Sequence, residues 1–150
     1  MIKKSFPIYY EGKRMLWPTG VAVWGAGGFV FLSGTEGQTK AEWVIEEGIE
    51  EQTRLSLEKL KDRLEDFGTS LENICHLWIY IVGKEFPDGI GGDPNFRKAT
   101  KVIGEFWQEH APELTFKRKP PASSLIGISG LACKGQLIEI VAIAALPPLT

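Results

Sequence analysis

Two apolar runs near the C-terminal end, Ser124–Ile128 and Leu137–Ala144, constrain the fold more than any other feature of the chain. Both are rich in Ile, Leu and Val, and a glycine-containing link, Gly130–Gly135, joins them. This pattern predicts two paired strands connected by a tight turn. Glu139 lies inside the second run. A carboxylate in so apolar a strand must be paired, hydrogen-bonded or used in chemistry, so Glu139 is the first candidate functional residue.

The bulk composition excludes several classes of protein. The chain has 150 residues, 43% hydrophobic and 24% charged, which predicts a single globular domain over residues 1–150. A net charge of −2 gives no general attraction to nucleic acid or to an anionic membrane. No apolar run approaches the roughly 20 residues that cross a bilayer, and the N-terminus lacks a signal-peptide core. We therefore expect a cytoplasmic protein, in which Cys75 and Cys133 are free thiols.

The first half of the chain predicts an arm, a hairpin and a helix. Residues 1–19 show no clear periodicity and are expected to form an irregular arm or a short edge strand. Val21–Val23 and Phe29–Leu32 flank a glycine-rich turn, which predicts a hairpin. Apolar residues recur every three or four positions over residues 45–67, which predicts an amphipathic helix that Gly68 ends. Its expected apolar face comprises Ile49, Thr53, Leu57, Leu60, Leu64 and Phe67.

The second half predicts a buried strand over residues 74–82 and a second helix over residues 95–110. The expected inner face of this helix comprises Phe96, Ala99, Val102, Ile103, Phe106 and His110. Gly83–Pro94 is a loop that either shapes a ligand cleft or is a surface insertion. The predicted order is β-β-α-β-α-β-β, a two-layer α+β domain with two helices on one face of a sheet. The apolar residues of the other face favour burial against another copy of the chain.

Four segments, in this order and spacing, resemble the Rid family, also called the YjgF/YER057c/UK114 or L-PSP endoribonuclease family. The resemblance covers residues 20–146, and the segments that carry it are Phe29–Gly34 (FVFLSG), Ile49–Leu64 (IEEQTRLSLEKLKDRL), Phe106–His110 (FWQEH) and Leu137–Ala144 (LIEIVAIA). The resemblance implies a chorismate-mutase-like domain that assembles as a homotrimer with clefts between subunits. It also implies cofactor-free, metal-free hydrolysis of enamines and imines formed from amino acids, with release of ammonia.

The resemblance also assigns roles to residues of the cleft. Glu139 would place or activate water for attack on the C=N bond, and Ser33 and Gly34 would line the cleft. Thr100 falls near a position that is often Asn in the family. The N-terminal segment that usually holds a Tyr reads Thr19-Gly20-Val21, without a phenol.

The chain departs from the family at the residue that clamps the substrate carboxylate. The family motif P-A-R-[ST] reads Pro121-Ala122-Ser123-Ser124, so Ser123 stands in place of the Arg. Losing a hydrogen bond to a charged group costs about 1.5–3 kcal/mol, which predicts at least tenfold weaker binding of a simple 2-imino acid. Ser123 and Ser124 are then expected to be neutral hydrogen-bond donors to a ligand, or simply small residues at the start of a strand. Arg118 or Lys119 could replace the cation by reaching back into the cleft, or could belong to a solvated charge run.

Three functions follow, in order of preference. The first is a divergent enamine or imine deaminase, or related hydrolase, with weak activity on simple 2-imino acids. The second is a trimer that binds a small metabolite with an amine, imine or carboxylate group without catalysis, in which Glu139 is a structural residue of the subunit interface. The third is a ribonuclease or translation inhibitor, which the acidic net charge disfavours.

Overall fold

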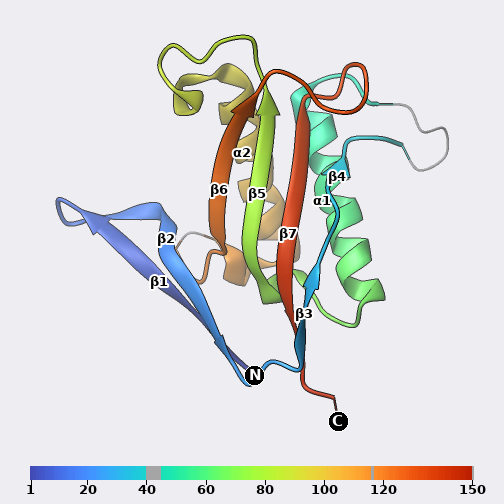
Figure 1. Ribbon diagram of the computed structural model, residues 1–150. Helices are drawn as coiled ribbons and strands as arrows, with labels where there is room; N and C mark the ends of the chain where they lie inside the picture. The colour runs from blue at the N-terminus through green and yellow to red at the C-terminus, as the bar shows by residue number, and fades with distance from the viewer. Residues whose placement is uncertain (40–44, 116, 150) are drawn as a thin grey trace.

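The computed structural model describes residues 1–39, 45–115 and 117–149 of the chain. Its helices are α1 (Ile49–Asp66) and α2 (Pro94–His110), with short 3-10 turns η1 (Leu71–Asn73), η2 (Ile90–Gly92) and η3 (Pro112–Leu114). Its strands are β1 (Ile2–Tyr10), β2 (Lys13–Trp24), β3 (Gly28–Phe31), β4 (Thr35–Glu36), β5 (Ile74–Val82), β6 (Ala122–Ile128) and β7 (Ile138–Leu146). Both helices pack on one face of the main sheet (Figure 1), so the predicted α+β class is confirmed.

The main sheet has the order β3-β7-β5-β6, with β4 also paired to β7. The prediction that the two C-terminal apolar runs pair with each other is wrong, because β5 lies between them. β6 runs parallel to β5, whereas β7 runs antiparallel to it. Parallel neighbours need a crossover connection, and α2 provides it between β5 and β6. The segment after β6 therefore crosses the end of β5 to reach β7, and is not a tight turn.

Helix α1 follows its apolar repeat and supplies the centre of the core. Leu57, Leu60 and Leu64 are fully buried against the sheet. The helix begins at Ile49 and not at residue 45, since Gly48 takes a φ of 84° that only glycine adopts readily. Phe67, expected on the inner face, is instead exposed, because it caps the last turn just before the left-handed Gly68.

Helix α2 begins one residue before the predicted start, where its capping residue is clear. The Asp93 carboxylate accepts hydrogen bonds from the backbone N–H groups of Asn95 and Phe96 at 2.8 and 3.1 Å, and Pro94 occupies the first turn. Its buried face consists of Ala99, Ile103, Phe106 and Trp107. The prediction omitted Trp107, and it included His110, which lies exposed at the helix end.

The N-terminal residues 1–24 form a β-hairpin of their own, β1 paired with β2, which projects from the body of the domain (Figure 1). The expectation of an irregular arm over residues 1–19 is therefore wrong, as is the hairpin expected between Val21–Val23 and Phe29–Leu32. Glu11 and Gly12, both with positive φ, make the turn between the two strands. Register shifts around Pro7 explain why the sequence shows no regular alternation here.

The hairpin is attached to the domain through the connector that precedes β6. Arg14 donates hydrogen bonds to the carbonyl oxygens of Lys117 and Arg118, each at 3.0 Å, and Ser5 donates to the carbonyl of Pro120 at 2.8 Å. β3 instead joins the main sheet through β7. Within the described residues, neither helix combines the length and the apolar character that crossing a bilayer requires.

Candidate functional site

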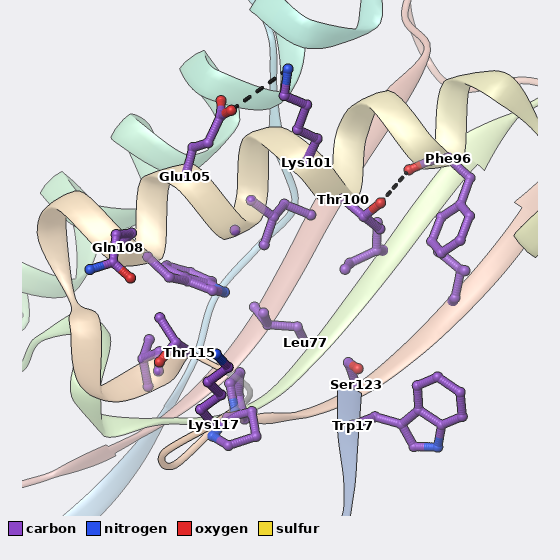
Figure 2. Close-up of a pocket in the computed structure, with 18 residues that line it drawn as sticks. Trp17, Leu77, Phe96, Thr100, Lys101, Glu105, Gln108, Thr115, Lys117 and Ser123 are labelled. Atoms are coloured by element: carbon purple, nitrogen blue, oxygen red, sulfur yellow. Dashed lines mark hydrogen bonds and ion pairs between the residues drawn. The ribbon is translucent and has the colours of Figure 1, made fainter. Parts of the chain in front are cut away.

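A pocket of about 900 Å³ lies where α2, the edge strand β6 and the N-terminal hairpin meet (Figure 2). Helix α2 contributes Phe96, Thr100 and Trp107 to its wall, and the neighbouring strands β5 and β6 contribute Leu77 and Ser123. Its other lining residues are Trp17, Ile79, Lys101, Ile103, Gly104, Glu105, Gln108, Leu114, Thr115, Lys117, Pro120, Pro121 and Leu125. Two predicted site residues, Thr100 and Ser123, thus share one pocket.

The strand register explains why Ser123 reaches the pocket. Ser123 pairs with Leu77, and Leu125 pairs with Ile79, in the parallel ladder between β6 and β5. Directly paired residues point to the same face of a sheet, and Leu77 and Ile79 are buried beneath the helices. Ser123 therefore faces α2. It is exposed, and its hydroxyl has no hydrogen-bond partner among the described residues, so it is available to a ligand.

The polar groups of the pocket are mostly neutral. The Thr100 hydroxyl donates to the carbonyl oxygens of Phe96 and Arg97 at 3.0 and 3.1 Å, which leaves it as an acceptor toward a ligand. The Thr115 hydroxyl donates to the Pro112 carbonyl at 2.9 Å. Lys101 pairs with Glu105 at 3.8 Å, and both extend from the side of α2 that faces away from Leu77 and Ser123 (Figure 2).

Glu139 lies outside this pocket. It pairs with Tyr80 in the ladder between β7 and β5, and Tyr80 is separated from Leu77 by an odd number of positions along β5. Because successive side chains of a strand alternate between faces, Glu139 and Ser123 lie on opposite faces of the sheet. A single copy of the chain does not bring these two predicted residues together.

The carboxylate of Glu139 is held by two neighbours on its own face. The Gln136 side-chain N–H donates to Glu139 Oε2 at 3.1 Å, and Gln136 is itself buried. Glu139 Oε1 lies 2.2 Å from the position that a Cβ atom on Gly34 would occupy, so the carboxylate lies directly against the Gly34 backbone. Glu139 and Gly34, which the resemblance assigns to the same cleft, therefore lie side by side in one copy of the chain.

Two cations from α1 reach the edge strand beside Glu139. Arg63 donates to the carbonyl oxygens of Ser33 and Gly34 at 3.2 and 3.1 Å. Lys59 pairs with Glu36 at 2.9 Å, and Glu36 is the strand partner of Glu139. Lys59 thereby neutralises the carboxylate of the residue paired with Glu139, which lowers the cost of placing two acidic residues side by side.

Ser124 lies on the same face as Glu139 and not on the face of Ser123. Its hydroxyl is 3.2 Å from His76 Nε2, and the His76 ring packs on Trp78 with the ring centroids 4.1 Å apart. Burial lowers the pKa of His76 below its usual range, which favours the neutral ring. This contact between Ser124 and His76 was not predictable from the sequence, since 48 positions separate the two residues.

Arg118 is not among the residues that line the pocket. Its guanidinium pairs with Glu113 in an exposed ion pair, and its backbone carbonyl anchors the hairpin. The neighbouring Lys117 lines the pocket instead. Lys119 also pairs with Glu113, at 3.8 Å. No residue of the Gly83–Pro94 loop lines the pocket. The first lining residue after the loop is Phe96 of α2.

Trp17 and Trp107 line the pocket but were not among the residues singled out in the sequence. Trp17, on β2, lines it from the side of the hairpin, two residues before the segment in which the family aromatic was expected. Trp107 lies on the buried face of α2. The signal that identifies Trp17 in the sequence is an aromatic residue of any kind near position 19, and not only a tyrosine.

The fold and the site together define a chorismate-mutase-like α+β domain with a ligand-sized pocket. Comparison with family models matches residues 19–146 to the family described as Endoribonuclease L-PSP. The chain therefore belongs to the L-PSP endoribonuclease family, also known as the Rid or YjgF/YER057c/UK114 family. The search of curated proteins gives no match.

Solved structures show the same fold. E. coli TdcF, crystallised with bound serine, is 25% identical, with 95% of this chain and 92% of that chain covered and a TM-score of 0.63. YyfB from Yersinia pestis, a protein of the Rid family, is 23% identical with a TM-score of 0.71, covering 97% of this chain and 100% of its own. Rv2704 from Mycobacterium tuberculosis is 19% identical with a TM-score of 0.58, with the same coverage of the two chains.

Proposed function

We propose that the protein is a cofactor-free hydrolase of enamines or imines, acting in a cleft between copies of the chain in a homotrimer. The observation that carries the proposal is the Glu139 carboxylate, held between Gly34 and Gln136 at the position where the resemblance expects a water-handling Glu. In the reaction, water adds to the carbon of the C=N bond and its proton passes to Glu139. Glu139 returns that proton to nitrogen, which gives a carbinolamine. It then takes the hydroxyl proton and passes it to the amino nitrogen, so that the C–N bond breaks, ammonia leaves and the carbonyl product forms.

The homotrimer is part of the proposal because the two halves of the site lie on opposite faces of one sheet. A second copy that packs its Glu139 face over the Ser123 pocket of the first would complete the cleft. Exposed aromatic residues at the β3 edge, Phe29 and Phe31, favour such packing. The two cysteines are both free thiols, as a reducing compartment allows, so we propose that the protein works in the cytoplasm.

A small amino-acid-derived ligand is supported by the TdcF structure, which holds serine. The chain has Ser123 where a family Arg would clamp a carboxylate, so turnover of simple 2-imino acids is expected to be weak. The binding-only alternative has the same pocket and differs only in the absence of turnover.

The test is hydrolysis of imines generated in situ by an L-amino-acid oxidase, with semicarbazide trapping of the surviving imine as the readout. Glu139→Gln is expected to lower kcat at least a hundredfold, as removal of a general base does. Ser123→Arg is expected to raise kcat/KM for the alanine-derived imine at least tenfold. A wild type without turnover on any imine, with ligand binding intact, would support the binding-only alternative.

A further inference from the structure

We infer that the pocket takes a planar aromatic ring and that its preferred ligands carry one; the identification of these ligands as imine substrates rests on the proposed function. The size of the cavity is the first observation in favour of a ring-bearing ligand. The cavity measures about 900 Å³, near the upper end of the 300–1,000 Å³ range of pockets that enclose drug-sized ligands. An imine derived from alanine has only a handful of non-hydrogen atoms and would fill a small part of it.

The walls match a flat apolar group. Trp17 and Phe96 approach the cavity from different elements, the hairpin and α2, and Leu77, Ile79 and Leu125 are the apolar residues of the strands between them. The Trp17 side chain is 49% exposed although it borders a pocket, so its ring has free surface that a bound ring can cover. Aromatic rings favour offset or edge-to-face contacts with one another.

None of the described lining residues is an Arg, so the wall has no guanidinium to clamp a carboxylate. Ser123 offers a neutral hydroxyl, and the Lys101 ammonium is directed to Glu105 on the far side of α2 (Figure 2). The remaining cation of the wall is Lys117, on the connector before β6. Because the Arg clamp is replaced by Ser123, binding has to come from another part of the ligand, and burial of a ring against Trp17 supplies it.

The polar groups fit the other end of such a ligand. In Figure 2, Thr100 and Phe96 extend from α2 toward the side of the pocket where Ser123 and Trp17 lie. The Thr100 oxygen is left as an acceptor and the Ser123 hydroxyl is unpaired among the described residues. Together they can bind an imine N–H and a carbonyl or imine nitrogen without formal charge.

The first experiment compares kcat/KM for the phenylalanine-derived and the alanine-derived imine. The wild type is expected to prefer the phenylalanine-derived imine at least tenfold, and Trp17→Ala is expected to lower this ratio at least tenfold. Trp17→Phe keeps a ring and should restore most of the preference. Trp24→Ala is the matched control, since Trp24 lies on the same strand, is 53% exposed and does not line the pocket; it should leave the ratio within twofold. Equal turnover of both imines, or an unchanged ratio in Trp17→Ala, overturns the inference.

The second experiment separates this inference from the proposed function. Binding of phenylacetamide and of acetamide is measured by ligand-observed NMR, which needs no turnover. Phenylacetamide binding that Trp17→Ala abolishes and Trp24→Ala retains supports the aromatic pocket, even when no imine is hydrolysed and the proposed hydrolase fails. Turnover of the alanine-derived imine without phenylacetamide binding overturns the aromatic pocket and leaves the hydrolase standing. Circular dichroism of each variant establishes that it is folded.

Discussion

The substitution Gly34→Ala adds one methyl group and tests the placement of Glu139. A Cβ atom there would meet Glu139 Oε1 at 2.2 Å, far inside van der Waals contact, so Gly34→Ala has to displace the carboxylate. We expect kcat for imine hydrolysis to fall at least tenfold in the semicarbazide assay, while KM changes less. Gly130→Ala is the control, because nothing lies within 4 Å of its Cβ position. Wild-type kcat in Gly34→Ala would contradict the assigned role of Glu139.

Gln52 carries the second prediction at this scale. It is buried, it donates to the carbonyl oxygens of Glu46 and Gly135 at 2.8 and 2.9 Å, and its Oε1 accepts from the Leu137 N–H at 2.7 Å. Gln52→Ala would remove the side-chain partner of three partly buried backbone groups, so the free energy of unfolding should fall by about 3 kcal/mol. Urea unfolding measures it, with the exposed Gln108→Ala as the control. A loss below about 1 kcal/mol would contradict this account.

Individual residues were predictable where the family resemblance assigns them a position in the cleft. Ser123 and Thr100 were singled out in the sequence and line one pocket in the structure. Trp17 was missed because it lies in a segment whose alternation is disturbed near Pro7 and Pro18. The division of Glu139 and Ser123 between two faces depends on how β5, β6 and β7 pair, which no single residue reveals.

The N-terminal hairpin is the element with the clearest pH dependence. Lys3 on β1 donates to the carbonyl of Glu72, and burial lowers its pKa from 10.5 to about 8. Attraction to Cys75 and Glu72 opposes this lowering, and repulsion by Lys119 adds to it. Between pH 8 and 10.5 the unfolded chain binds more protons at Lys3 than the folded chain does. The Lys3 contribution to the free energy of unfolding therefore rises with pH, by up to about 3 kcal/mol.

The measurement for Lys3 is urea unfolding of wild type and Lys3→Met from pH 7 to pH 10. Burial raises the pKa of Cys75. Ionisation of its thiol therefore destabilises the folded state of both proteins as the pH rises, and in the wild type this opposes the effect of Lys3. The difference between the two proteins reports Lys3 together with its attraction for the Cys75 thiolate. Both effects should change the difference in favour of the wild type as the pH rises. Parallel stability curves would contradict the assignment.

Elements with strong periodicity were predictable, and their partners were not. The strand over residues 74–82 and the helix over residues 95–110 agree with β5 and α2 to within one residue. The pairing of the two C-terminal strands was wrong because proximity along the chain favours a hairpin, whereas the α2 crossover places β6 beside β5. Polar and apolar residues do not alternate regularly over residues 1–24, because register shifts interrupt the pairing of β1 and β2.

At the scale of the whole molecule, complementation between copies tests the composite cleft. Glu139→Gln damages one half of the proposed site, and Ser123→Trp would fill the pocket of the other half. When the two inactive variants are refolded together in equal amounts, about a quarter of the clefts would combine two intact halves. Imine hydrolysis should therefore return to about a quarter of the wild-type rate. Mixed oligomers without activity would show that one chain holds the whole site.

The assembly itself is measured by light scattering coupled to size exclusion. Three chains of 16.7 kDa predict a mass of about 50 kDa. Phe31→Glu places a charge on an aromatic side chain that is 74% exposed at the β3 edge, and it should shift the mass toward one chain and abolish turnover together. A monomeric variant that keeps full activity would contradict the proposed cleft.

The N-terminal hairpin lies outside the main sheet, yet it carries Trp17, one wall of the pocket. The buried residues of the core are thus largely separate from Trp17, which lines the pocket. Substitutions in this hairpin can change which molecule is accepted without rebuilding the scaffold, so related proteins can diverge in preference while their interiors stay alike. Residues 1–24 can therefore be exchanged between family members as one segment. Such an exchange would replace one wall of the pocket and leave Glu139 and its neighbours in place.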